Sequence, residues 1–236
     1  MRMSKEAAAL SRVRIIEAAS RLLRERGVEA TSIADVMAAA GMTHGGFYKH
    51  FQSKDELVVA ALSAAFASHA DRFDRCCERD GPAAALAAYV AEYLSSDHVA
   101  HPGMGCPVAA LGPDAGRSAA EVAQAFARGV EDIVARFATG APDGYGAAES
   151  RAAAIRRLAT MVGAVVVARG IGPGVLRDEV LAACSDAANV PPLGGARRRR
   201  TSEAKPDLAP RASEGSSDGQ DRRASDRGRP PPRRGI

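Results

Sequence analysis

The segment 31–56 constrains the fold of this chain more than any other, because it carries the start and stop signals of two short helices. Thr31 or Ser32 can cap the first helix, whose apolar residues recur on one face. Gly41 supplies the left-handed residue with which such a helix often ends. Thr43 can then cap the second helix. The segment is therefore predicted to form two helices joined by a tight turn.

The second helix of this pair is expected to run from His44 to Phe51, with an apolar side and a polar side. Phe47 and Phe51 are four residues apart, a spacing that places both rings on one inward face. The polar and basic residues of the helix are left to face elsewhere: His44, Tyr48, Lys49 and His50. A helix-turn-helix with this layout is typical of a module that reads DNA.

The composition supports an all-helical fold around this segment. The chain has 236 residues, 4% aromatic residues and no Trp, so its core must be built mainly from Ala, Leu, Val and Ile. Such a mixture favours closely packed helices. Residues 1–56 carry nine basic and seven acidic side chains, and residues 194–236 carry twelve basic and six acidic ones. The basic excess is therefore at the two ends of the chain.

Apolar spacing and helix-stop signals divide the rest of the chain into further helices. Val13 and Leu23 are expected on the inward side of the first helix, which should pack across the helix-turn-helix. Pairs of serine and glutamate are predicted to form capping boxes at Ser53 and at Ser118. The predicted helices span residues 11–26, 53–77, 82–93, 107–112, 118–137, 147–168 and 175–188, with a break over 95–105.

Three regions follow from these signals. Residues 1–56 are expected to form the DNA-binding domain, and residues 57–193 a second helical domain. Residues 194–236 are rich in Arg, Pro, Ser, Gly and Asp and contain almost no large apolar side chains. They are predicted to be a disordered basic tail, because such a segment cannot bury enough apolar surface to fold.

The chain shows no pattern of a secretory signal, and its apolar runs are too short to span a bilayer. A cytoplasmic protein without membrane contact is therefore expected. In a reducing compartment the four cysteines, of which Cys76 and Cys77 are adjacent, should be free thiols. No cysteine and histidine spacing suggests a metal site, and no catalytic motif is found. The protein is predicted not to be an enzyme and to need no metal or cofactor.

A set of residues that is specific in type and order runs through 12–56: Ile15, Ala18, Ala19, Gly27, Thr31 to Ile33, Val36, Ala40 to Thr43, Gly46 to Phe51, and Ser53 to Leu57. With these residues the segment resembles the N-terminal DNA-binding domain of the TetR family of transcriptional regulators. The GCPVAALGP sequence at 105–113 resembles an element found in a subset of that family. The resemblance implies that residues 57–193 form a ligand-binding and dimerisation domain.

A recognition helix that enters the major groove reads base edges with its first residues, so Thr43, His44 and Gly45 are the predicted readers. Contacts to phosphate are expected from side chains that donate hydrogen bonds or carry positive charge: Tyr48, Lys49, His50 and Lys54. Alternatively, Tyr48 and His50 only cap and pack the three-helix unit.

Three further residues are counted with the same DNA-binding set: Thr31, Ser32 and Phe47. The spacing of Phe47 from Phe51 nevertheless favours a place in the core for both rings. The sequence therefore leaves two roles open for Phe47.

One such module contacts too little DNA to bind tightly, so two copies are expected to occupy successive grooves about 34 Å apart. In the resembled family the last two helices join their symmetry mates in a four-helix bundle. This implies a dimer interface formed by Leu158, Met161, Val162, Val165, Val175 and Leu176. About half of these residues could instead be buried inside the monomer, because periodicity does not identify the partner of a face.

The resemblance also implies a ligand pocket in the second domain, with an unknown small-molecule inducer. Its candidate lining residues are Phe66, His69, Tyr89, Tyr93, Met104, Cys106, Phe126 and Met161. A subset of these would touch the ligand, and the others would be plain core.

Cys106 precedes Pro107 at a predicted helix start, where the helix dipole favours a thiolate over a thiol. Cys106 is therefore either a reactive sensor or an inert buried thiol. Two other functions stay open. One is a thiol-dependent enzyme that uses Cys106 with His98 or His101, and the other is a sequence-nonspecific DNA-binding protein that uses the basic tail.

The favoured hypothesis is a ligand-responsive transcriptional regulator, usually a repressor. It would bind a palindromic double-stranded DNA operator as a homodimer, and a small-molecule or electrophile inducer would release it.

Overall fold

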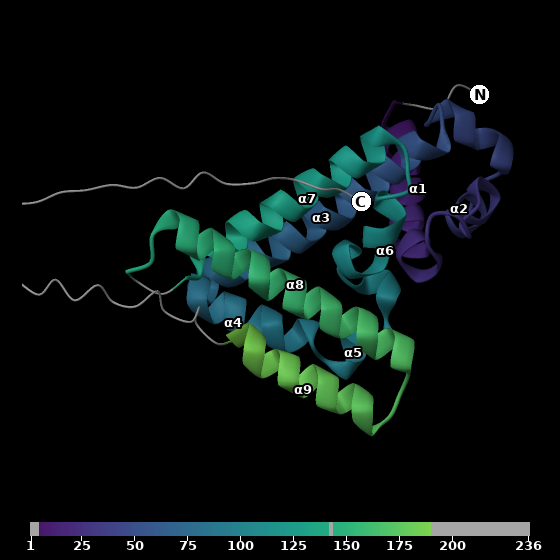
Figure 1. Ribbon diagram of the computed structural model, residues 1–236. Coiled ribbons are helices and arrows are strands. Elements are labelled where there is room, and N and C mark those ends of the chain that lie inside the picture. The colour runs from purple at the N-terminus through teal and green to yellow at the C-terminus, as the bar shows by residue number, and fades with distance from the viewer. Residues whose placement is uncertain (1–4, 142–143, 190–236) are drawn as a thin grey trace, which may run out of the picture. The chain divides into compact units, whose positions relative to one another are not determined.

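The computed structural model describes residues 5–141 and 144–189, and every regular element in these ranges is a helix (Figure 1). This confirms the all-helical prediction. The basic tail predicted over 194–236 lies outside the described residues. The elements are α1 (Lys5–Arg26), α2 (Ile33–Ala39), the 3-10 helix η1 (His44–Lys49), α3 (Lys54–Asp80), α4 (Pro82–Tyr93), α5 (Ser96–Ala100), the 3-10 helix η2 (Pro102–Met104), α6 (Pro107–Ala115), α7 (Ala120–Thr139), α8 (Ala147–Ile171) and α9 (Val175–Asn189).

The first three elements form a small unit in which α1 packs on α2 and α2 packs on η1. Ile15 and Leu23 of α1 and Met37 of α2 are buried together with Phe47 of η1. α1 begins at Lys5, earlier than the predicted residue 11, and its Val13 is exposed rather than inward. Val13 is therefore not part of the core that the other apolar residues of α1 help to form, and it lies half exposed at the surface of this helix.

α3 is the long element that connects this unit to the rest of the protein. Its N-terminal end packs against α1, and its length runs beside α7 and α4. Ser53 caps α3 by accepting a hydrogen bond from the amide of Glu56 at 3.1 Å, as predicted. The carboxylate of Glu56 completes the cap on Gln52 rather than on Ser53. The predicted domain boundary at 56–57 falls inside this uninterrupted helix.

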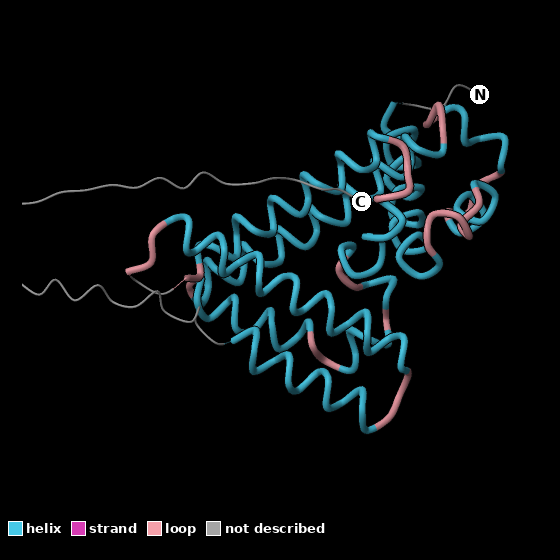
Figure 2. Tube along the Cα trace, in the orientation of Figure 1, coloured by secondary structure: helices cyan, strands magenta, loops and turns pink. Residues whose placement is uncertain are grey.

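The second half of the chain is a stack of helices. α7 lies beside α3, α8 beside α7, and α9 folds back along α8 (Figures 1 and 2). α7 approaches α3 closely at Gly129, where the Cβ atom of any other residue would overlap the ring of Phe66. This glycine therefore sets the distance between the two helices. Among residues 5–141 and 144–189, no helix is long and apolar enough to span a membrane.

The connection between α4 and α7 differs from the prediction. The break expected over 95–105 contains α5 and η2, and α6 continues through Pro113 to Ala115. The capping box predicted at Ser118 is wrong, because α7 begins at Ala120 and the Ser118 hydroxyl donates instead to the carbonyl of Asp114 at 2.8 Å. Ser118 thus closes the end of α6 and not the start of α7.

Candidate DNA-binding surface, effector chamber and dimer face

α2 is fixed at both ends by side chains. Ser32 accepts a hydrogen bond from the amide of Asp35, and the Asp35 carboxylate accepts one from the amide of Ser32, each at 3.1 Å. This capping box lowers the pKa of Asp35, because the hydrogen bonds from Ser32 favour its ionised form. At the other end Arg14 of α1 donates to the carbonyl of Ala40 at 2.8 Å. The start of α2 is thus fixed by its own cap, and its end is fixed to α1 by Arg14.

The turn after α2 places the recognition helix. Gly41 has a φ of 71°, the left-handed conformation predicted for it, and the amide of Met42 donates to the carbonyl of Met37 at 2.8 Å. Thr43 stands at the N-cap position of η1, but its side chain makes no capping hydrogen bond. The hydroxyl of Thr43 is therefore not used by the helix that it precedes, in contrast to the prediction.

η1 is a 3-10 helix, tighter than an α-helix, and it is anchored by two aromatic rings. Phe47 and Phe51 stack with centroids 5.7 Å apart, and both are buried. The guanidinium of Arg12 lies 4.7 Å from the centre of the Phe51 ring, in a cation–π contact with α1. Tyr48 meets the edge of Phe47 with its own ring and remains 66% exposed. The helix thus has a buried aromatic side and an open polar side, as predicted.

The open side carries most of the predicted DNA contacts. Thr43, His44 and Gly45 are exposed, and so are Tyr48 and Lys49, while His50 is half-buried. Gly45 is notable because nothing lies within 4 Å of the Cβ atom that another residue would carry there. The described part of the chain therefore leaves room for a larger residue at this position.

Two residues of the predicted DNA-binding set do not face outward. Thr31 is buried, and its hydroxyl donates to the carbonyl of Gly27 at 2.8 Å, which closes the turn between α1 and α2. Phe47 is fully buried in the aromatic anchor. Both side chains lie beneath the exposed surface of the DNA-binding unit, so a role in DNA binding stays a prediction for these two residues. Lys54, half-buried, donates to the carbonyl of Val28 at 2.7 Å, so one of its three N–H groups is already engaged.

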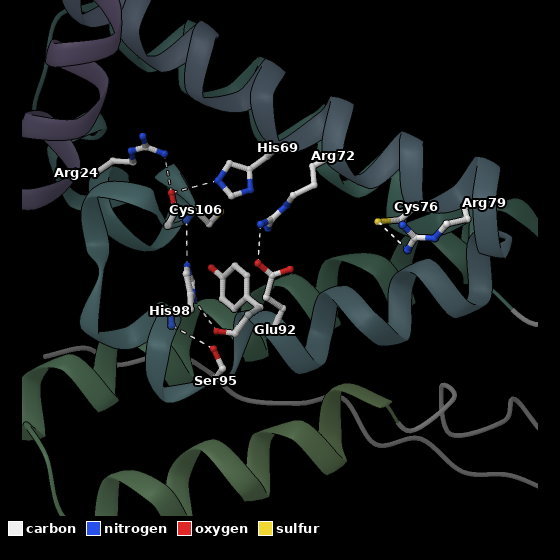
Figure 3. A network of polar contacts seen from close by, with 11 residues as sticks. Arg24, His69, Arg72, Cys76, Arg79, Glu92, Ser95, His98 and Cys106 are labelled. Carbon is white, nitrogen blue, oxygen red and sulfur yellow. Dashed lines mark hydrogen bonds and ion pairs between the residues drawn. The ribbon is translucent and has the colours of Figure 1, made fainter.

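Polar side chains in the helical body surround the backbone carbonyl of Gly105, and two of them, Arg24 and His69, are labelled in Figure 3. Arg24 of α1 donates to this oxygen at 2.8 Å, and His69 of α3 lies 3.2 Å from it through Nε2. Since a carbonyl can only accept, Nε2 carries the proton and Nδ1 is a bare acceptor. Within residues 5–141 and 144–189 Nδ1 has no hydrogen-bond partner, and burial lowers the pKa of His69 to about 4.

His98 forms a hydrogen bond with Cys106, the residue that follows Gly105. Its Nε2 accepts a hydrogen bond from the amide of Cys106 at 3.1 Å, and its Nδ1 lies 2.6 Å from the carbonyl of Tyr93. Both ring nitrogens are therefore used by backbone groups in a neutral ring. Arg169 of α8 donates to the carbonyls of His98 and Val99. Side chains of α1, α3 and α8 thus converge on the segment 98–106, which the sequence alone did not reveal.

The surroundings of Cys106 bear on the two roles that the sequence left open for it. The thiol is fully buried at the N-terminus of α6, and desolvation raises the pKa of Cys106 more than the nearby amides lower it. The structure therefore favours the inert buried thiol over the reactive sensor. The arrangement also does not support an enzyme in which His98 is the general base, because both ring nitrogens of His98 are bonded to backbone groups. His101 is exposed and pairs with Asp97.

The predicted pocket residues fall into three groups. Phe66, His69 and Tyr89 line a small chamber of about 20 Å³ between α3, α4 and α7. Tyr93, Cys106 and Met161 are buried beside it or deeper in the core. Phe126 is partly buried against Phe66, whereas Met104 is 75% exposed and does not belong to the core. The chamber also has residues that were not predicted: Ala70, Phe73, Gly129, Asp132, Ile133, Arg136 and Phe137.

The residues predicted for the dimer interface differ in their exposure. Leu158, Met161 and Val165 are buried within the protomer, the alternative that the sequence left open for about half of this set, and Val162 is half-buried. Val175 is 76% exposed and Leu176 is 56% exposed. The structure adds exposed apolar residues on α8 that the sequence reading did not assign to the interface: Ile155, Val166, Val167 and Ile171.

The helix-turn-helix and the helical body both have counterparts among known proteins. The family described as bacterial regulatory proteins, tetR family, matches residues 15–61. An uncharacterized HTH-type transcriptional regulator of Mycobacterium tuberculosis is 31% identical over 172 residues, which cover 67% of this chain and 84% of that protein. This chain belongs to the TetR family.

Other TetR-family proteins are similar over shorter or more distant matches. The HTH-type transcriptional regulator TtgR of Pseudomonas putida is 42% identical over 80 residues, so the match covers 34% of this chain and only 38% of TtgR. A TetR-family regulator from Cytophaga hutchinsonii superposes with a TM-score of 0.65 at 18% identity, over 80% of this chain and 96% of that one. Reduced NemR of E. coli gives 0.62 at 19% identity, over 75% and 95%. At these identities the two structures show the shared fold alone.

The TetR-family match runs from Ile15 of α1 through α2 and η1 into the first turns of α3. It therefore contains every residue of the exposed polar side of η1. It ends before the Gly105 segment, the aromatic chamber and the exposed face of α8 and α9, so the family match carries no information about these parts.

Proposed function

We propose that this protein is a transcriptional regulator that reads double-stranded DNA with the open side of η1. The observation that carries the proposal is the exposed row Thr43, His44 and Gly45 at the start of a short helix whose other side is locked by aromatic rings. A rigid helix that presents its first residues outward can place them against base edges in the major groove. Tyr48, Lys49 and His50 would hold the phosphates on either side.

A homodimer would bring two such helices to one operator. The support is the apolar face of α8 and α9, where exposed Ile155 and Val166 share one side of α8 with Gly163. Gly163 has nothing within 4 Å of its absent Cβ, so nothing in the protomer requires a glycine there. Large exposed apolar side chains beside such a glycine suit the close approach of a second copy.

Ligand response would pass through the segment 98–106. The aromatic chamber of about 20 Å³ would have to widen to hold a small molecule, and a molecule bound there would meet His69, whose Nε2 side already contacts Gly105. Arg24 of α1 donates to the same carbonyl of Gly105, so this segment is also bonded to the helix on which the DNA-binding unit is built. Binding would therefore shift the spacing of the two reading helices, provided that the ligand prefers one spacing. We propose repression released by such a ligand as the usual outcome.

The test uses purified full-length protein and labelled DNA fragments, beginning with the intergenic region next to its own gene. We expect retention of a fragment that contains an inverted repeat, at a stoichiometry of two chains for each operator. His44→Ala should reduce this retention at least about tenfold. Arg128→Ala, at an exposed position of α7, serves as the control. Equal binding of unrelated fragments, or no effect of His44→Ala, would contradict reading by η1.

A further inference from the structure

A groove of about 710 Å³ lies at the junction of the DNA-binding unit and the helical body. Its walls come from α1 and the end of α2 on one side, and from α3 and η2 on the other. This volume is in the range of sites that hold small organic ligands. The groove differs from the aromatic chamber between α3, α4 and α7, although His69 forms part of the wall of both.

The wall on the α1 side is rich in guanidinium groups. Arg14, Arg21 and Arg24 line the groove, with Glu17 as the carboxylate that faces them. Arg21 is already paired with Glu25 at 3.3 Å. The α1 wall therefore carries an excess of positive charge.

Arg24 is the most buried of these three guanidinium groups. Its Nε donates to the carbonyl of Ser20 at 2.9 Å, and its Nη1 donates to the carbonyl of Gly105 at 2.8 Å. Both acceptors are neutral, and within the described part of the chain no carboxylate forms an ion pair with it. Burial lowers the pKa of Arg24, which reports the cost of holding this charge away from water.

The other wall offers apolar surface. Ala64 and Ala65 of α3 and the exposed side chain of Met104 supply small and flexible contacts. His69 closes the wall behind them and is only 8% exposed, and its buried Nδ1 has no partner among the described residues. The groove thus combines a partly buried guanidinium that has no ion-pair partner in the described part of the chain with an apolar bed, behind which a buried histidine lies.

We propose that this groove is an effector site for a small organic carboxylate with an apolar body. The carboxylate pairs with the free N–H groups of Arg24, because a fork of donors fits two carboxylate oxygens. The apolar body lies on Ala64, Ala65 and Met104. This assignment goes beyond the regulator proposed above, which would hold its inducer in the aromatic chamber.

Occupation of the groove would act on DNA binding directly. A carboxylate on the free N–H groups of Arg24 would draw the guanidinium toward the groove and away from the carbonyl of Gly105, and the ligand touches both walls of the junction. The contact that joins α1 to the segment 98–106 is then weakened. Operator affinity should change by the ratio of ligand affinities for the two arrangements of the junction.

The direct test is a calorimetric titration of the full-length protein with octanoate and with 1-octanol, a neutral probe of the same length. We expect octanoate to bind at least about tenfold more tightly than octanol. Arg24→Gln keeps an amide donor for Gly105 and removes the charge, so it should cost octanoate about tenfold in affinity and leave octanol unchanged. Ala64→Phe fills the groove and should weaken both probes.

Arg128→Gln, which removes an exposed charge on α7, is the matched control and should change neither affinity. Circular dichroism of each variant confirms that it is folded. Equal affinity for the two probes, or tight octanoate binding by both Arg24→Gln and Ala64→Phe, would overturn the site. The titration measures ligand binding in the absence of DNA. A negative titration would therefore contradict the effector site and not the operator binding proposed above. A protein that bound octanoate but no operator would contradict only the proposed regulator.

Discussion

Arg24 of α1 and His69 of α3 contact one acceptor, the carbonyl oxygen of Gly105, at 2.8 and 3.2 Å. One residue belongs to the helix that supports the DNA-binding unit, and the other to the wall of the aromatic chamber. Gly105 itself lies between η2 and α6, where a Cβ atom would come within 2.6 Å of His98 Nε2. A short backbone segment thus joins the two functional parts of the protein.

Gly45 should matter for DNA and not for folding. Gly45→Ala places a methyl group in open space, so the free energy of unfolding should stay within about 0.5 kcal/mol of the parent. If the backbone of η1 approaches the operator closely there, affinity should fall about tenfold, or about 1.4 kcal/mol. Fluorescence anisotropy with labelled operator measures this. Gly116→Ala, an exposed glycine of ordinary φ at the end of α6, is the control. Unchanged affinity for Gly45→Ala would argue against close approach at this residue.

His69 should make stability depend on pH. Its folded-state pKa of about 4 lies below the ordinary value of 6.5, so the unfolded chain takes up a proton first as the pH falls. The contribution is fully present above pH 6.5 and is lost between about pH 6.5 and 4, and a shift of this size corresponds to about 3 kcal/mol. Urea unfolding at pH 7 and at pH 4.5 tests this. His69→Phe should flatten the difference between the two values, and an equally steep loss in that variant would assign it to other groups.

Cys106 should be slow to react in the folded protein. The thiol is buried and its pKa is raised, so labelling by iodoacetamide at neutral pH should lag well behind that of the partly exposed Cys76. Mass spectrometry of tryptic peptides over a time course measures both rates. Cys106→Ser should also leave operator release by electrophiles unchanged. Preferential labelling of Cys106 would restore the sensor hypothesis.

Val166 should lie in the dimer interface. Val166→Glu puts a carboxylate on the exposed apolar face of α8 and should weaken dimerisation about 30-fold, corresponding to about 2 kcal/mol. Sedimentation velocity over a range of protein concentrations gives the dissociation constant. Ala127→Glu, on the exposed side of α7, adds the same charge elsewhere and should have no effect. A dimer of unchanged stability in Val166→Glu would place the interface on another surface.

Local signals accounted for most helices and for the recognition surface. The Ser32 cap, the left-handed Gly41 and the four-residue spacing of Phe47 and Phe51 act over a few residues, so the sequence displays them directly. The same kind of signal failed at Ser118, because its hydroxyl found the carbonyl of Asp114 instead of a helix start. A short polar side chain can bond to either neighbouring turn, and only packing chooses between them.

The sequence by itself determined that this protein is helical and that it carries a TetR-type helix-turn-helix, because periodicity, caps and motif spacing are properties of adjacent residues. Tertiary structure decided which apolar residues of α8 remain exposed, that Cys106 is buried, and that Arg24 and His69 meet at Gly105. In the last of these, Arg24 and His69 are 81 and 36 positions away from Gly105 in the chain. Their contacts arise from the packing of whole helices, which no local pattern specifies.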